Sequence, residues 1–164
     1  INEYSGGSGD YPYTFVGKLE YEPGTYRARG LIKFNVSAIP SDSEILDAEI
    51  RISVHGGGDN EFNVRFRPVL KDWAEYEVTW WRAKEDEPWE SPGGDVGDPI
   101  AEVPVSWTLV VHNDALRDLV QGWVSGETPN YGIMLEADDA PNYKSIRILQ
   151  KNSGSYTDLS LIHI

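Results

Sequence analysis

The sequence predicts a single β-sandwich domain of about nine short strands with one helix. Several segments alternate apolar and polar residues with a period of two, which is typical of strands that bury one face. The 16 glycines and 10 prolines are spread along the chain, as expected when many strands are joined by turns. The length of 164 residues suits one domain with a sizeable core, so we expect residues 1–164 to fold together.

Three segments give the clearest strand patterns. Residues 26–36 alternate apolar Ile32, Phe34 and Val36 with polar neighbours. Residues 45–55 and 62–69 alternate in the same way, and their apolar positions are expected to face the core: Ala48, Ile50, Ile52, Val54, Phe62, Val64 and Phe66. Shorter strands are expected in residues 11–22, 100–105, 107–111, 131–137, 145–149 and 159–164.

One segment after residue 112 has helical periodicity. Its apolar residues recur at i, i+3, i+4, i+7 and i+8, namely Leu116, Leu119, Val120, Trp123 and Val124. Asn113 stands where an N-cap is needed, and Gly126 suits the position just after the helix. The spacing therefore predicts a helix of about ten residues among the strands.

Residues 72–95 hold four of the six tryptophans and follow neither strand nor helix periodicity. Leaving four indoles exposed would forfeit roughly 1.5–3 kcal/mol each, so we expect a long loop that folds back onto a sheet. Within it, Trp73, Val78 and Trp80 are expected to fix the loop to the core. Asp72 and Glu75 are expected to accept hydrogen bonds from backbone N–H groups at the two ends of the loop.

Trp81 and Trp89 are the candidate ligand-binding rings of this loop. Trp81 follows a ring expected to face inward, so on a period of two it should face outward, and Trp89 stands between Pro88 and Glu90. Exposed indoles offer a flat apolar face on which a sugar ring stacks. The alternative is that both rings cover a neighbouring loop.

Basic residues on the outward faces of the predicted strands are the candidate charged contacts. Arg51, Arg65 and Arg67, together with Lys33 and Arg147, would form a basic stripe if they shared one sheet face. Guanidinium groups bind carboxylates in a bidentate manner, which would suit an acidic polysaccharide. The alternative is cross-strand pairing with acidic residues such as Glu49 and Glu61.

Two acidic loops are candidate calcium sites. Asp95 and Asp98 lie in one loop, and Asp138 and Asp139 in another. Calcium takes six to eight oxygen ligands from such loops, although neither has the spacing of a 12-residue calcium loop. Structural calcium is therefore one expectation for these residues, and solvated turn acids are the other.

Composition excludes several classes of function. A net charge of −13 disfavours binding to free nucleic acid. The absence of cysteine excludes disulfides, zinc–thiolate sites and thiol nucleophiles, and no apolar stretch is long enough to insert into a membrane. The three histidines are scattered, and neither G-x-S-x-G nor H-E-x-x-H occurs, so no enzyme activity is expected. The start at Ile1 fits a mature or excised segment.

Five motifs in order resemble the DNRLRE domain family, which overlaps carbohydrate-binding module family 96, and domains of archaeal disaggregatase-type surface proteins. They are RGLIKFNVSAIP (29–40), ILDAEIRISV (45–54), DWAEYEVTWW (72–81), PWESPGGD (88–95) and LVQGWVSGETPNYGIMLEA (119–137). The resemblance implies a secreted jelly roll of two antiparallel sheets, used as one module of a larger surface protein or polysaccharide-degrading enzyme. Some members of the family bind acidic polysaccharide such as alginate. The string that names the family is absent, and Trp81 replaces its usual Asn.

These observations together predict a non-catalytic extracellular module that binds a polysaccharide. The predicted binding residues are Trp81, Trp89, Arg65, Arg67 and Arg51. The alternative is a structural or assembly domain of a cell-surface protein, adhesin or filament, in which edge strands and the acidic surface serve assembly.

Overall fold

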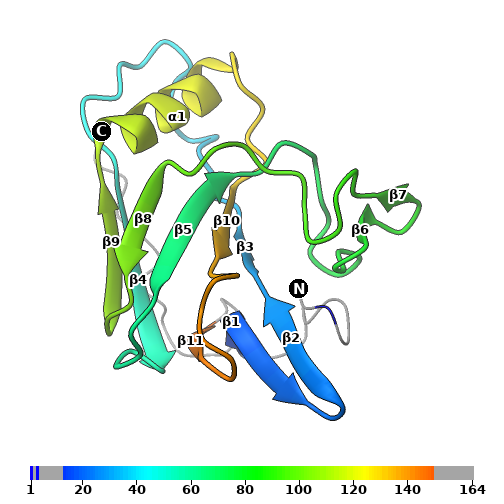
Figure 1. The fold of residues 1–164 in the computed structure, drawn as a ribbon. Coiled ribbons are helices and arrows are strands. Elements are labelled where there is room, and N and C mark those ends of the chain that lie inside the picture. Colours follow the sequence, from blue (N-terminus) through cyan, green and yellow to red (C-terminus); the bar gives the residue numbers. More distant parts are fainter. Residues whose placement is uncertain (2, 4–12, 150–164) are drawn as a thin grey trace.

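The computed structural model of the protein describes residues 1, 3 and 13–149 and shows two antiparallel β-sheets packed face to face, with one helix at one end (Figure 1). The first sheet has the strand order β2-β1-β11-β4-β9, and the second has the order β3-β10-β5-β8. The strands of the first sheet are β2 (Gly24–Ala28), β1 (Tyr13–Tyr21), β11 (Ser145–Leu149), β4 (Glu49–Gly56) and β9 (Thr108–His112). Those of the second are β3 (Gly30–Ile32), β10 (Ile133–Glu136), β5 (Asn63–Pro68) and β8 (Ala101–Pro104).

The connections make this sandwich a jelly roll, as the family resemblance implies. The chain changes sheet between β2 and β3, β3 and β4, β4 and β5, β8 and β9, β9 and β10, and β10 and β11. As a result β1-β11-β4-β9 faces β3-β10-β5-β8, and β2 extends the first sheet by a hairpin from β1. The predicted all-β sandwich with one helix is confirmed.

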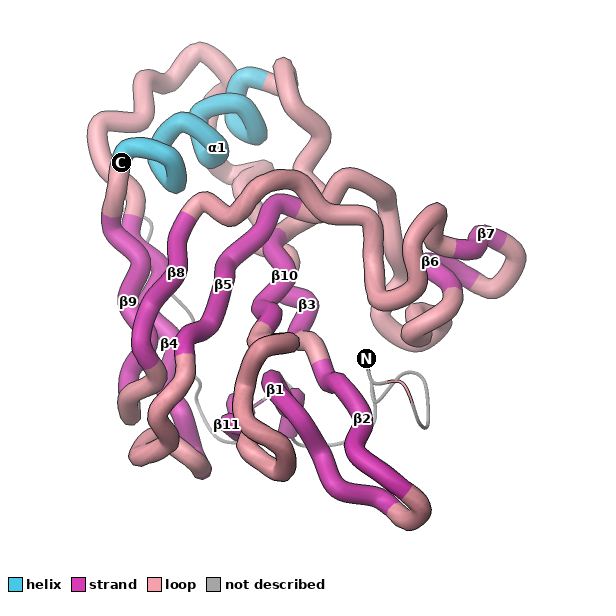
Figure 2. Tube along the Cα trace, in the orientation of Figure 1, coloured by secondary structure: helices cyan, strands magenta, loops and turns pink. Residues whose placement is uncertain are grey.

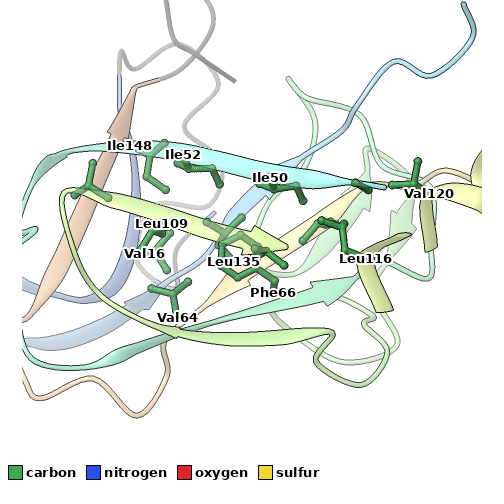
Figure 3. Close-up of a cluster of buried hydrophobic side chains, with 14 of the residues drawn as sticks. Val16, Ile50, Ile52, Val64, Phe66, Leu109, Leu116, Val120, Leu135 and Ile148 are labelled. Carbon is green, nitrogen blue, oxygen red and sulfur yellow. The ribbon is translucent and has the colours of Figure 1, made fainter. Parts of the chain in front are cut away.

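The main core lies between the two sheets, and Figure 3 shows its centre. Ile50, Ile52 and Leu109 of the first sheet pack against Phe66 and Leu135 of the second. All the predicted inward residues of β4 and β5 take part, and fully burying each such side chain contributes roughly 1.5–3 kcal/mol. The period-two pattern therefore identified the core faces of both strands.

The predicted helix is α1 (Asp114–Ser125), and both of its predicted ends are confirmed. The Asn113 side-chain oxygen accepts a hydrogen bond from the Leu116 N–H at 2.9 Å, and Gly126 adopts a left-handed conformation with φ of 76°. The Trp123 ring is buried and stacks on Phe34, with ring centroids 6.4 Å apart. The helix thereby closes one end of the sandwich (Figure 1).

Some strand boundaries differ from those expected. The predicted strand 26–36 is split at Arg29 into β2 and β3, and the chain leaves the sheet after Ile32. Phe34 and Val36 lie in the loop after β3, and their side chains still pack against the main core as predicted. In this loop the Asn35 side chain accepts a hydrogen bond from the Ser37 N–H at 3.0 Å. The strand expected at residues 159–164 lies outside the described residues.

Candidate functional site

The tryptophan-rich loop is a closed excursion of residues 69–97 between β5 and β8. A bridge between Val69 and Val96 joins its two ends, and the Leu70 N–H donates to the Asp95 carbonyl at 2.9 Å. Inside it, β6 (Arg82–Lys84) and β7 (Glu87–Pro88) form a small hairpin that projects from the sandwich (Figure 2). The predicted long loop is thus confirmed, with a hairpin that the sequence pattern did not predict.

The loop packs on the outer face of the second sheet and forms a second hydrophobic core there. Met134 of β10 points away from the main core, and its side chain is completely buried under the loop. The cluster consists of Ile1, Val69, Val78, Trp80, Ala83, Trp89 and Met134, with Trp73 packed against it. The prediction that Trp73, Val78 and Trp80 hold the loop in place is confirmed.

The Trp80 ring is the centre of this second core and is only 1% exposed. The guanidinium carbons of Arg27 and Arg29 lie 5.1 and 4.9 Å from its ring centroid, within the range of cation–π attraction. Gly93 has a φ of 95°, and a Cβ there would lie 2.8 Å from the Trp80 ring and 2.7 Å from the Arg29 guanidinium. Only glycine fits this turn without displacing one of these groups.

Trp81 is 61% exposed, as predicted, while its backbone is held on both sides. Its N–H donates to the Thr79 hydroxyl at 3.2 Å, and its carbonyl accepts from the Trp89 N–H at 3.2 Å. The two tryptophans lie in a bend closed by Thr79, whose hydroxyl accepts from the N–H groups of Trp81 and Arg82, and this bend sends Trp80 inward and Trp81 outward. The result is a large apolar ring on a fixed backbone, open to solvent.

The expectation that Trp89 is exposed is wrong. Its ring is 5% exposed and belongs to the second core, and its Nε1–H donates to the Thr79 carbonyl at 3.0 Å. The indole N–H of Trp73 also has a backbone partner, because it donates to the Tyr131 carbonyl at 2.8 Å. Buried indoles require such a partner, and both use a backbone oxygen. Trp89 therefore stabilises the loop and presents no free ring face.

Asp72 has a different role from the one predicted. Its carboxylate pairs with Lys33 and Lys84, each at 3.1 Å, rather than with backbone N–H groups. Burial by itself would raise the pKa of Asp72, but the hydrogen bonds and charges of the two lysines bring that pKa below its ordinary value. Asp72 thus ties the hairpin, through Lys84, to the chain just after β3.

Arg65 and Arg67 point out of β5 on the same side, as predicted, yet both are paired with carboxylates. Arg65 contacts Asp139 at 2.5 Å and Glu102 at 3.2 Å, and the hydrogen bond that Arg65 donates to Asp139 is the main cause of its raised pKa. Arg67 contacts the buried Glu136 at 3.3 Å and donates to the Gly97 carbonyl at 2.8 Å. Cross-strand and loop acids therefore neutralise these two arginines.

These contacts belong to a larger group that we call the arginine–carboxylate network. Its members lie on the outer face of the second sheet or beside it: Arg27, Arg29, Arg65, Arg67, Glu3, Glu102, Glu136, Asp138 and Asp139. Glu136 lies within 3.7 Å of guanidinium nitrogens from Arg29, Arg65 and Arg67. With four cations and five anions, the network presents fixed donors and acceptors rather than a positive patch.

The predicted basic stripe is not formed, because its members lie on different sheets. Arg51 is in β4 of the first sheet, where it pairs with Glu49 at 2.9 Å. Arg147 is also in the first sheet, and its guanidinium lies 5.7 Å from the centre of the Tyr13 ring. Lys33 follows β3 of the second sheet. The sequence pattern could identify outward residues, but not which of the two outer faces each strand would occupy.

Three of the four aspartates predicted as calcium ligands already have partners within the protein. Asp138 binds the Arg27 and Arg29 guanidiniums, and Asp139 binds Arg65. The Asp95 carboxylate accepts from the backbone N–H groups of Glu90 and Ser91 at 3.0 and 2.9 Å. Neither these residues nor any other described Asp, Glu or His residues form a group of three or more that could hold a metal ion.

Comparison with known families confirms the resemblance to carbohydrate-binding module family 96. Residues 14–88 match the profile of carbohydrate-binding module family 96. The matched region runs from β1 through β7 and includes Trp80, Trp81 and the hairpin. Neither the curated proteins nor the solved structures yielded a similar protein. Within the described part of the chain, no helix has the length and apolar character needed to cross a membrane.

Proposed function

We propose that this domain is a non-catalytic carbohydrate-binding module that binds a polysaccharide outside the cell, with Trp81 as its stacking platform. The observation that carries the proposal is the exposure of this ring on a loop whose neighbouring tryptophans are buried. The family match supports the ligand class, and it includes the segment that bears Trp81. A sugar stacks the C–H face of its ring on an indole of this kind.

The fixed backbone of Trp81 favours binding. A ring that is already held in place loses little conformational freedom when a ligand binds, so more of the contact energy appears as affinity. The hydrogen bond that Trp81 donates to Thr79 and the one that it accepts from Trp89 hold the backbone, and the second core beneath keeps the loop in position. Trp81 is therefore a better platform than an aromatic residue on an unsupported loop.

The arginine–carboxylate network favours a ligand bound through hydroxyl groups over one bound through charge. Arg65 and Arg67 are already paired, so a uronic acid would have to displace Glu136, Glu102 or Asp139 to reach them. Sugar hydroxyls both donate and accept hydrogen bonds, and the network offers fixed acceptors and donors. We therefore propose a polysaccharide bound chiefly by stacking and hydroxyl contacts, with weak dependence on salt.

Binding should be measured by calorimetry and by affinity electrophoresis against neutral polysaccharides and polyuronates, at low and high salt. Trp81→Ala should weaken binding at every salt concentration, because stacking is barely screened by salt. Leu46→Ala is the matched control, because Leu46 is also a large exposed apolar residue but lies outside the loop. Both variants should keep the melting temperature of the wild type. A Trp81→Ala domain that binds as well as wild type would remove Trp81 from the site.

A salt-sensitive interaction with polyuronates alone would indicate that the ligand is acidic and that it displaces the carboxylates of the network. If no polysaccharide binds, and the domain instead forms ordered assemblies at high concentration, the alternative of a structural domain of a surface protein becomes the better proposal. Sedimentation of the same samples distinguishes these outcomes.

A further inference from the structure

A second exposed tryptophan, Trp107, lies far from the tryptophan-rich loop. It stands in the connection from β8 to β9 and is 59% exposed. That connection leaves the end of the β5–β8 pair where Asn63 is opposite Pro104, whereas the tryptophan-rich loop leaves from Pro68 at the other end. The six residues of β5 separate the two ends by about 20 Å. Figure 1 shows the β8–β9 connection and the β6–β7 hairpin in different parts of the molecule.

The Trp107 indole lies against the glycine turn that joins β4 to β5. A Cβ on Gly58 would be 2.5, 2.8 and 2.9 Å from three atoms of the indole, so the ring covers the backbone of this residue. Gly58 is buried as a consequence, although it lies in a turn. One side of the ring is therefore supported by the turn, and the exposed surface must belong mainly to the other side.

The backbone around Trp107 is fixed. Its carbonyl accepts from the Val54 N–H at 3.0 Å, which extends the pairing of β4 with β9 to this residue. The Ser106 hydroxyl donates to the Thr108 carbonyl at 2.5 Å and closes a tight turn around the tryptophan. On the other side, the Asn60 side-chain amide donates to the Ser145 carbonyl at 3.0 Å and anchors the glycine turn to β11. The ring and its support thus form one rigid unit.

A purely structural role would not leave this much ring in water. Trp80, Trp89 and Trp123 pack in the two cores and are at most 6% exposed, and the half-buried Trp73 packs against the second core. Trp81 and Trp107 alone among the six tryptophans keep most of their surface open, and all six lie in the described residues. Exposed apolar area costs roughly 25 cal/mol per Å², and an exposed indole on a rigid support offers a ligand ring a flat apolar face.

We propose that Trp107 is a second sugar-stacking site, separate from Trp81, so that one domain holds two segments of polysaccharide. The ligand class rests on the proposed function, whereas the site itself rests on the geometry of Trp107 and Gly58. A pyranose ring stacks on the open indole face. The exposed Asp59 follows Gly58 in the same turn and supplies an acceptor for its hydroxyl groups.

Two sites on one rigid domain have a consequence for long ligands. A chain bound at one site raises the effective concentration of its other segments at the second site, and separate chains become bridged. A polysaccharide should therefore bind more tightly, per domain, than its short oligosaccharides. A variant that lacks either ring should bind the polysaccharide and a short oligosaccharide with similar affinity, and it should still bind one oligosaccharide per domain.

The test is a calorimetric titration with cellotetraose, mannotetraose and a tetrauronate, using wild type, Trp107→Ala, Trp81→Ala and the double variant. With the tetrasaccharide that binds, we expect two ligands per wild-type domain, one for each single variant and none for the double variant. Trp107→Phe, which keeps an aromatic ring, should retain the second site with affinity within about tenfold of wild type. Melting temperatures should be unchanged in all variants, because both rings lie at the surface.

The outcomes separate this proposal from the proposed function. One ligand per wild-type domain, lost in Trp81→Ala and kept in Trp107→Ala, would overturn the second site and leave the proposed function intact. One ligand that is lost only in Trp107→Ala would support the Trp107 site and overturn Trp81 as the platform. Two ligands that persist in Trp107→Ala would also overturn the proposal, and an absence of binding to all three probes would overturn both proposals.

Discussion

The Arg29 guanidinium lies between the Trp80 ring, whose centroid is 4.9 Å away, and a carboxylate pair formed by Asp138 and Glu136. It therefore belongs to both the second hydrophobic core and the arginine–carboxylate network. Its Nη1 also donates to the Gly93 carbonyl at 3.1 Å, which fixes the last turn of the tryptophan-rich loop. This one side chain couples the charge of the sheet face to the position of the loop that carries Trp81.

Removal of Arg29 should destabilise the domain strongly. Arg29→Ala leaves Asp138 and the buried Glu136 with fewer compensating charges, and losing one partner of a buried ion pair costs about 3–5 kcal/mol. Arg51→Ala is the matched control, since the Arg51–Glu49 pair is exposed and should be worth less than about 1 kcal/mol. Urea unfolding of the two variants measures both values. Equal losses for the two would show that the network contributes no more than a surface pair.

The stability of the domain should depend on pH through Asp138. Burial alone would raise its pKa, but Arg29, together with Arg27, holds the pKa below its ordinary value of 3.8. Near pH 4 the unfolded chain therefore binds more protons than the folded one, so stability rises with pH in this range. The contribution of Asp138 is complete above about pH 5 and is lost as the pH falls through its folded pKa.

Asp138→Asn tests this dependence. The variant should be less stable than wild type at pH 7, and the difference in unfolding free energy should shrink as the pH falls below about 4. Denaturant titrations at pH 7, 5, 4 and 3.5 give the comparison. A difference that stays constant across these values would mean that Asp138 acts through packing and not through its charge.

The parts of the fold that were predicted from the sequence are those decided by local periodicity. Val64 and Phe66 alternate with Arg65 and Arg67, and the two pairs do face opposite sides of β5. Both ends of α1 were predicted because the signals that end a helix are local. Asn113 caps the N–H of Leu116, three residues away, and Gly126 directly follows the last helical residue. Trp81 does face outward as predicted, but the cause is the bend at residues 79–82 and not the alternation of a strand.

The parts that were missed depend on contacts between distant segments. Arg65 finds its carboxylate partner at Asp139, 74 residues away, so no local pattern indicates that the arginine is neutralised. Trp89 is buried because the loop folds over Met134, which lies on a later strand. The pattern around Trp107 predicts only the start of a strand, and the contact of its ring with Gly58 in the β4–β5 turn depends on the tertiary fold. A tryptophan next to a strand end was the only sequence signal for this residue.

Trp123 should be far more important for stability than Trp81. Trp123 is buried under α1 and stacks on Phe34, so Trp123→Ala should cost about 3–5 kcal/mol. Trp81→Ala removes an exposed ring and should change stability by less than about 1 kcal/mol. Urea titration of the two variants gives the comparison. A cost below 1 kcal/mol for Trp123→Ala would contradict its burial.

Calcium should leave the melting temperature unchanged. A metal that binds only the folded state raises stability by mass action, but Asp138 and Asp139 are already paired with arginines and Asp95 closes a turn. Melting curves in millimolar calcium and in a chelator should therefore coincide within about 1 °C. A larger rise in calcium, lost on Asp95→Asn or Asp139→Asn, would show that the loops rearrange to bind the ion.

Gly93 should be intolerant of any side chain, because it holds the loop against the sheet. Its φ of 95° is unfavourable for other residues, and a Cβ would lie within 3.0 Å of both the Arg29 guanidinium and the Trp80 ring. Backbone strain of about 1–3 kcal/mol adds to a similar cost for overpacking, so Gly93→Ala should lose about 2–4 kcal/mol. Gly24→Ala is the matched control, since no atom lies within 4 Å of its added Cβ.

The two glycine variants also test whether the tryptophan-rich loop unfolds independently of the sandwich. Hydrogen exchange of Gly93→Ala should increase first in residues 72–95, while the strands β4 and β9 keep their protection, because only the second core is displaced. Glycan binding at Trp81 should weaken with it, whereas binding at Trp107 should persist at the other end of β5. Equal unfolding of the loop and the strands would show that the second core and the main core form one cooperative unit.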